Sequence, residues 1–335
     1  MLNYLIKRLF HMVFVLWGVS TAAFFLSNVV PTDPAAAALG GNARQEQIEA
    51  FREKYGLNKP IYVQYQIYVS NLLKGDLGHS LRTKRSIIQD IGQVFPATVE
   101  LTLSALLVSL LFGLPLGVIA AINQDKLIDL IVRTIALIAG AVPIYWLALI
   151  LINYFHAELG WVPGPGRLDA FIFPPPRVTG FMTIDSLLAQ DYEAFWDALR
   201  HLILPGLVLG SFSTALVTRM TRSAMLEVLN QDYVRTAHSK GLSKNTVIYK
   251  HALRNAALPI LTVAGNVLGS LLAGAVLTET IFSWQGLGSY ATTGVTSLDV
   301  PAVMGVTLVA GIVYSIINLL VDLSYALFDP RISYQ

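Results

Sequence analysis

The chain has 335 residues, of which 54% are hydrophobic and 13% are charged, and its formal net charge is +2. Soluble domains carry about 25% charged residues, so these charges are too few to cover a water-facing surface, and we expect much of the chain to face lipid. The small net charge gives no indication of a nucleic-acid partner, and the absence of cysteine excludes disulfides, thiol catalysis and cysteine-ligated metal sites.

Six stretches without Asp, Glu, Lys or Arg are long enough to cross a membrane, which takes about 17–25 apolar residues, and the fourth is the weakest because it lies at the lower limit. They are Leu9–Val30, Leu101–Ile122, Thr134–Ala157, Leu202–Thr218, Ala256–Thr278 and Pro301–Val321. The first follows Lys7 and Arg8 as in a signal peptide, but it is longer than the roughly 7–15 apolar residues of such peptides, so we expect a retained helix. The sequence therefore predicts an all-α membrane protein with six transmembrane helices.

The distribution of basic residues predicts the orientation. With both termini in the cytoplasm, the cytoplasmic pieces are 1–8, 123–133, 219–258 and 326–335. These pieces hold 12 of the 23 Lys and Arg, whereas the outer loops 157–200 and 282–300 hold 3. Because cytoplasmic loops collect basic residues, this asymmetry indicates cytoplasmic termini. The outer loop 31–96 holds 8 basic residues, but loops beyond about 60 residues largely escape the rule.

Residues 31–96 are patterned like a separate outer subdomain, between a first unit 1–30 and a five-helix core 97–335. We expect a polar helix over 42–55, a turn over 55–60, and a second helix over 61–72 whose apolar stripe is Tyr65, Tyr68 and Leu72. Gly75 to Gly78 then turns the chain. Tyrosines favour the membrane–water boundary, so the second helix is expected on the outer surface. It is either a structural cap on the bundle or a contact for a partner or substrate.

The cytoplasmic loop 219–258 is basic and patterned as two short helices. The first is expected from Ser223 to Ser239 and stops at Gly241, since glycine suits a left-handed helix cap. Ser243 then offers an N-cap for a second helix to about Ala257, and Pro259 marks the entry to the next span. The loop is either a solvated connector or a docking surface, and two capped helices favour docking.

Two passages of this loop carry a family likeness. They are Arg235-Thr236-Ala237-His238-Ser239-Lys240-Gly241-Leu242-Ser243 and His251-Ala252-Leu253-Arg254-Asn255-Ala256-Ala257-Leu258-Pro259. They resemble the coupling loop of ABC importer permeases, which reads Glu-Ala-Ala, three residues, Gly, and later a hydrophobic-x-Leu-Pro ending. Arg235-Thr236 replaces the Glu-Ala pair, and Gly241 lies farther from Pro259 than in the general motif. Both departures are typical of the dipeptide/oligopeptide/nickel branch, and the chain is most similar to B-type dipeptide permease subunits.

Further matching passages extend the resemblance along nearly the whole chain. They are Lys7-Arg8-Leu9, Pro31-Thr32-Asp33-Pro34, residues 55–60, Gln64-Tyr65, residues 75–80, residues 219–227, residues 277–284 and Asp329-Pro330-Arg331. The resemblance implies the type I ABC importer permease fold, with a cytoplasmic coupling helix pair in the bacterial inner membrane. The residues implied in coupling to an ATPase are Arg235, Thr236, Ala237, Gly241, Leu242, Ser243, Leu258 and Pro259.

The family likeness also implies partners. These are a homologous second permease, two cytoplasmic ATPase subunits and an extracytoplasmic binding protein. The chain has no Gly-x-x-x-x-Gly-Lys-Ser/Thr phosphate loop and no Gly-Lys dipeptide, so we expect ATP hydrolysis in the ATPase subunits and neither a catalytic site nor a cofactor in this chain. The implied substrates are di- or oligopeptides, with nickel chelates or glutathione as alternatives. A self-contained secondary transporter is the runner-up, and it would need a carboxylate near a span's centre or matching broken helices in two halves.

Two acidic residues near the ends of spans have alternative interpretations. Glu279 is either a contact for a peptide's amino terminus, in a pathway with Thr280 and Asn266, or an interfacial carboxylate bonded to a neighbouring threonine. Asp322 is either a partner of Arg219 or Arg222 or part of a proton relay.

The histidines show no spacing typical of metal ligands. None is expected to have a carboxylate partner at helical offset within a span, so we interpret all six as interfacial or structural.

Overall fold

The computed structural model describes residues 2–29, 44–56 and 58–328. Within these ranges the regular elements are helices, and strand-like pairing is limited to one isolated bridge between His79 and Ser86. The helices are α1 (Leu2–Val29), α3 (Gln45–Tyr55), α4 (Ile61–Leu73), α5 (Ile87–Ile122), α6 (Leu127–Ala141), α7 (Ile144–Leu151), η1 (Ile152–Glu158), α8 (Met182–Leu188), α9 (Tyr192–Leu229), α10 (Asp232–Ser239), η2 (Thr246–Ala252), α11 (Leu253–Gly274), α12 (Val276–Ile281), α13 (Leu287–Thr296) and α14 (Val300–Phe328), of which η1 and η2 are π-helical.

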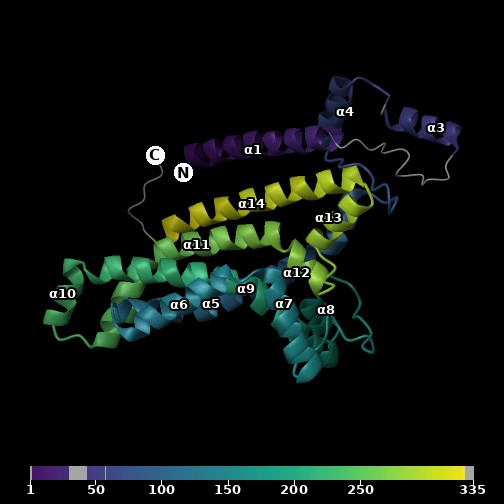
Figure 1. The fold of residues 1–335 in the computed structure, drawn as a ribbon. Helices are drawn as coiled ribbons and strands as arrows, with labels where there is room; N and C mark the ends of the chain where they lie inside the picture. The colour runs from purple at the N-terminus through teal and green to yellow at the C-terminus, as the bar shows by residue number, and fades with distance from the viewer. Residues whose placement is uncertain (1, 30–43, 57, 329–335) are drawn as a thin grey trace.

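The long helices run alongside one another as a bundle with two distinct ends (Figure 1). One end carries α10, and α1 begins and α14 ends toward this side; we name it the α10 end. The other carries α3, α4, α8, α12 and α13, and we name it the α8 end. In the described part of the chain, five helices are long and apolar enough to cross a membrane, and a bent pair makes up to six. The expected all-helical membrane architecture is confirmed.

The spans differ from the predicted stretches at their ends. The second and fourth run over 36 and 38 residues, as α5 and α9, well beyond Leu101–Ile122 and Leu202–Thr218. The scan for uncharged stretches ended these helices too early, because charged residues such as Glu100 and Arg222 lie inside them and are paired. The proposed boundary at residue 96 likewise falls inside the continuous helix α5.

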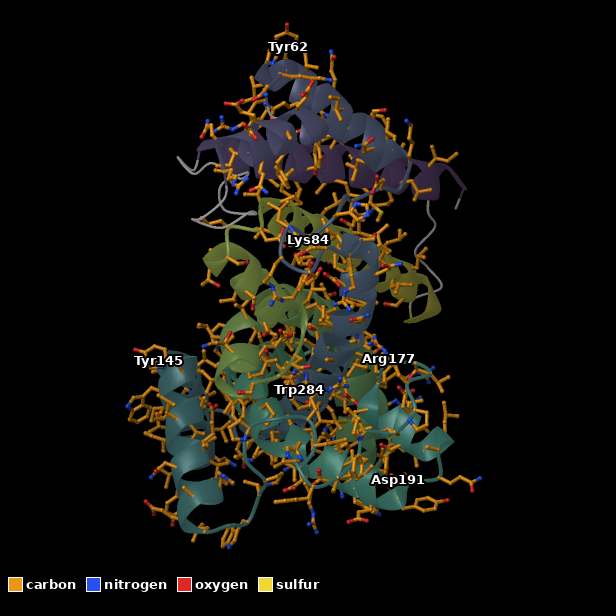
Figure 2. The ribbon with its side chains drawn as sticks, turned by 90° about the vertical axis from the view of Figure 1, so that its right-hand side faces the viewer. Tyr62, Lys84, Tyr145, Arg177, Asp191 and Trp284 are labelled. Atoms are coloured by element: carbon orange, nitrogen blue, oxygen red, sulfur yellow. The ribbon has the colours of Figure 1, made fainter. Side chains whose placement is uncertain are left out.

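The third span is broken, which the sequence interpretation did not foresee. The bend between Leu127–Ala141 and Ile144–Glu158 is 98°. It lies at Val142, whose φ of −69° and ψ of 127° are extended. Because a proline disfavours the helical conformation of the residue before it, Pro143 sets this break. Figure 2 views the molecule from the α8 end, with Tyr145 of α7 on the opposite side of Trp284 from Arg177.

Helices α5 and α9 approach each other closely along most of their length. A Cβ at Gly117 of α5 would lie 2.5 Å from Cβ of Thr221, and one at Gly210 of α9 would lie 2.7 Å from the carbonyl oxygen of Ala105. No side chain fits at either position without displacing its neighbour, so the two backbones pack almost directly on each other. Such small-residue contacts are typical of helix pairs in membranes.

Helix α4 packs on the end of α1, which itself lies along α14 (Figure 1). Tyr68 stacks on Phe24 with ring centroids 5.4 Å apart, and Tyr65 stacks on Phe25 at 5.7 Å. The Tyr65 hydroxyl also lies 2.7 Å from Thr21 Oγ1. The predicted second helix of the outer loop is therefore confirmed, and its tyrosine stripe faces a neighbouring helix. The predicted first helix is seen as Gln45–Tyr55, since Arg44 is extended and forms its N-cap; residues 42 and 43 of the prediction lie outside the described residues.

Candidate functional site

The chain between α9 and α11 forms an elbow, residues 230–252, that projects at the α10 end. One predicted boundary is wrong here, since α9 continues to Leu229 and the helix expected over Ser223–Ser239 is interrupted. The side-chain amide of Asn230 donates to the carbonyl of Leu226 at 2.9 Å, which ends α9. Gln231 is then extended, with φ −75° and ψ 150°, and α10 starts at Asp232.

The turn after α10 has the predicted left-handed glycine. Gly241 has φ 77°, and its amide donates to the carbonyl of His238 at 2.9 Å. Ser243 Oγ accepts from the amide of Thr246 at 3.4 Å, so this serine caps the second helix as expected. The second helix, however, continues through η2 into α11, and Pro259 lies inside α11. The expected end near Ala257 is therefore wrong.

Apolar side chains fasten the elbow to the bundle. Val234 and Ala237 on one face of α10 are buried against Val247 of η2. Farther along, Ile248 and Ala252 are buried in a cluster with residues of α5 and α9. The elbow is thus a preformed structure that is attached to α9 and α11.

The opposite face of α10 is exposed and basic. The predicted coupling residues Arg235, Thr236, Gly241, Leu242 and Ser243 are all exposed, whereas Ala237 is buried. Leu258 and Pro259 lie in α11, away from the turn. Four further cations on the elbow or just after it are exposed: Lys240, Lys244, Lys250 and Arg254. The carboxylate of Asp232, 96% exposed, lies 3.5 Å from Arg235 and offers little compensation. This face is suited to a groove of another polypeptide that carries acidic side chains.

A buried ion pair lies between α6 and α9. Asp129, 0% exposed, accepts from Nε and Nη2 of Arg222, each at 2.7 Å, and Arg133 lies 3.4 Å away. The sequence interpretation missed this pair, although an aspartate in the first turn of an apolar helix is a signal for a buried partner. The ion pair of Asp322 is instead with Arg8, at 2.7 Å, and it joins α1 to α14.

At the α8 end, Glu279 is a buried anchor. Its side chain is 0% exposed and accepts from Thr98 Oγ1 at 2.6 Å and from the amide of Ser289 at 2.8 Å, whereas the neighbouring Thr280 hydroxyl donates to the carbonyl of Val276. A Cβ at Gly286 would clash with Glu279 and Thr98. The carboxylate therefore fixes the turn between α12 and α13, and the expected bond to a neighbouring threonine is replaced by one to α5. Thr280 and Asn266 are exposed, so the three residues named for a pathway differ in their access to a solute.

A second carboxylate attaches the loop 159–191 to α5. Glu100 lies 2.7 Å from Nη2 of Arg167 and accepts from the amide of Thr183 at 2.9 Å. The guanidinium of Arg167 also lies over the ring of Trp284, 5.5 Å from its centroid. Trp284 in turn donates its indole N–H to the carbonyl of Ala97 at 2.8 Å. The loop, α5 and the α12–α13 turn are thereby joined.

A third carboxylate, Asp185 of α8, shapes the loop itself. It accepts from the amide of Thr179 at 2.7 Å and from the amide of Gly180 at 2.8 Å. Burial alone would raise the pKa of this carboxyl, but the hydrogen bonds from Thr179 and Gly180 outweigh it and hold the pKa below its ordinary value.

One histidine differs from its sequence interpretation. Asp197 lies 3.2 Å from Nδ1 of His201, four residues away on α9, so a carboxylate partner at helical offset does exist. The same Nδ1 lies 2.9 Å from the Asp197 carbonyl, and the buried ring is held in place by both groups.

Comparisons with known proteins match the sequence of this chain to a transport family. Residues 113–334 match the family described as "Binding-protein-dependent transport system inner membrane component", and residues 1–102 match its N-terminal region. The chain is 47% identical to the di/tripeptide transport system permease protein DppB of Pseudomonas aeruginosa, over 100% of both chains. It is 44% identical to the probable D,D-dipeptide transport system permease protein DdpB of Escherichia coli, over 97% of this chain and 96% of that one. It is also 35% identical to the glutathione transport system permease protein GsiC of Escherichia coli, over 100% of both.

A solved structure shares the fold. A chain of the MetNI methionine ABC transporter, in an inward-facing conformation, matches with a TM-score of 0.50 over 70% of this chain and 93% of its own. The sequence identity of 15% means that this likeness concerns the fold alone.

Proposed function

Because the chain belongs to the family of binding-protein-dependent transport system inner membrane components, we propose that it is one of two homologous permease subunits of an ATP-driven peptide importer. In this proposal the chain carries no catalytic site, and separate cytoplasmic ATPase subunits supply the energy. Concentrating a solute costs about 1.4 kcal/mol per tenfold gradient. The sequence has no phosphate loop with which to hold ATP, so this energy enters from partner chains or from an ion gradient, and membership of the family favours ATPase partners.

Di- and oligopeptides are the proposed substrate class. The di/tripeptide and D,D-dipeptide permeases are the relatives with the higher identities quoted above, 47% and 44%. The 35% identity to the glutathione permease leaves glutathione as an alternative substrate, together with nickel chelates from the same branch.

The elbow is the proposed site of coupling, and its exposed basic face is the observation that carries the proposal. In this arrangement the α10 end is cytoplasmic, both termini lie on that side, and the subdomain 31–96 lies outside. An ATPase groove receives α10, centred on residues 235–243. Closure of the ATPase pair moves the elbow as a lever. Helices α9 and α11 then tilt and switch the transport pathway between inward- and outward-facing states.

Gly241→Pro tests the lever. Proline holds φ near −65°, which is incompatible with the φ of 77° at Gly241, so the turn must rearrange. We expect ATP-driven uptake of a dipeptide into proteoliposomes to be lost, while membrane insertion and ATP hydrolysis persist. The matched control is Gly75→Pro at the other end of the molecule. Gly75 also has φ 77° with no atom within 4 Å of an added Cβ, as at Gly241. Normal uptake by Gly241→Pro would contradict coupling through the elbow.

The same proteoliposomes separate an importer from a secondary transporter. Uptake should require ATP, the ATPase subunits and the binding protein, and should persist when ionophores collapse the proton and sodium gradients. Uptake by the permease alone, driven by an ion gradient, would contradict the proposed function.

A further inference from the structure

A short apolar tip, residues 169–177, stands out on the loop at the α8 end. Phe171 and Phe173 are 93% and 89% exposed, the two largest exposed fractions among the large apolar side chains in the described part of the chain. Isolated exposed apolar residues are ordinary, but two aromatic side chains two positions apart on one short segment, both almost fully exposed, point to a contact surface.

Both ends of this tip are fastened to spanning helices. At its start, the amide of Asp169 donates to Asp197 Oδ2 of α9 at 2.7 Å. At its end, Nη2 of Arg177 donates to the carbonyls of Gly92 and Gln93 of α5, at 2.8 and 2.9 Å. These contacts fix the two ends of the tip beside α9 and α5.

Within the tip, the backbone is already restricted. Asp169 Oδ1 accepts from the amide of Phe171 at 2.9 Å, which forms a local turn. Three consecutive prolines, Pro174 to Pro176, follow with fixed φ and no backbone N–H. A segment ordered before binding loses little further entropy when its side chains are buried, which is the property of a preorganised binding surface.

We infer that Phe171 and Phe173 insert into an apolar pocket of the extracytoplasmic substrate-binding protein. This inference rests on the proposed function and on the family's dependence on a binding protein. The tip lies at the α8 end, which faces outward in that proposal; Figure 2 shows this end with its anchor Arg177 labelled. Burial of the tip in hydrocarbon would carry Asp169 and Arg177 toward the lipid, which is costly for charged groups. A protein pocket receives the rings and leaves these charges in water.

The affinity of the binding protein tests the inference. The assembled importer is placed in nanodiscs, and the probe is the peptide-loaded binding protein that stimulates its ATP hydrolysis. The double variant Phe171→Ser/Phe173→Ser should weaken binding at least tenfold and leave ATP hydrolysis without binding protein unchanged. The matched control, Phe171→Leu/Phe173→Leu, keeps apolar side chains and should retain most of the affinity. Unchanged affinity of the serine variant would overturn the inference.

A single label identifies what covers the tip. The chain has no cysteine, so Phe173→Cys offers a unique position for an environment-sensitive fluorophore on this subunit. We expect the label to be quenched by iodide in the importer alone and shielded when the binding protein is added. Quenching by lipid-borne spin labels would indicate membrane insertion, and shielding before the binding protein is added would indicate the second permease; either result overturns the inference. If the wild-type importer shows no stimulation by any binding protein, the proposed function itself fails.

Discussion

At the α8 end, the connections between helices are held by buried carboxylates, whereas at the α10 end helix α10 of the elbow is held by a small apolar contact with η2. Glu100, Asp185 and Glu279 each accept hydrogen bonds from backbone amides or side chains of a neighbouring loop. Helix α10 of the elbow instead presents its polar groups to solvent and packs on η2 through Val234 and Val247. Buried polar contacts fix one geometry, because breaking any of them leaves an unpaired group. Apolar contacts without direction allow the elbow to shift while it stays attached.

The largest expected difference between the two ends comes from removing one member of a buried ion pair. Glu100→Ala leaves Arg167 without its carboxylate and should cost about 3–5 kcal/mol of stability. The midpoint of thermal unfolding in detergent measures this loss. Asp232→Ala removes the carboxylate of the exposed pair on the elbow and is the control, with no measurable change expected. Equal shifts of the unfolding midpoint with Glu100→Ala and Asp232→Ala would show that the buried pair stabilises the protein no more than the exposed pair.

A smaller effect is expected at Asp185. Asp185→Asn places an amide NH₂ group against donors and should cost about 2 kcal/mol at neutral pH. Since folding lowers the pKa of this carboxyl from 3.8, its stabilisation is fully present above that value and is lost as pH falls through the folded-state pKa. Limited proteolysis of the loop 159–191, from about pH 5 to about pH 3, should therefore accelerate in wild type and lose part of this pH dependence in the variant. Identical pH profiles would show that Asp185 does not hold the loop.

The smallest effect is expected at the elbow itself. Val234→Ala removes about two methylene equivalents from the contact with Val247, worth about 1.6 kcal/mol. Because few contacts hold α10, this loss should appear as faster amide hydrogen exchange in α10 with an unchanged global unfolding midpoint. Thr236→Ala, on the exposed face of the same helix, should leave the exchange of the α10 amides nearly unchanged. A fall in global stability with Val234→Ala would show that the elbow is as firmly integrated as the α8 end.

Much of the fold could be predicted because local chemistry determines it. Apolar stretches locate the spans. Residue type alone predicts the left-handed turn at Gly241 and the cap at Ser243. The partners of Asp129 and Asp322 were not predictable, since their cations, Arg222 and Arg8, lie far away in sequence and hydropathy does not encode which helices are neighbours. The bend at Val142 was missed for a different reason. Pro143 lies inside an apolar stretch, and whether a proline there kinks a span or breaks it depends on what the chain packs against afterwards.

The glycine contacts between α5 and α9 have a mechanical consequence. The backbones of these two helices touch at Gly117 and Gly210, so neither helix can bend without bending the other. The pair therefore resists bending more than either helix alone. A displacement applied at α10 is therefore transmitted to the opposite side of the molecule with little bending of these helices. In the proposed lever, α5 therefore tilts together with α9.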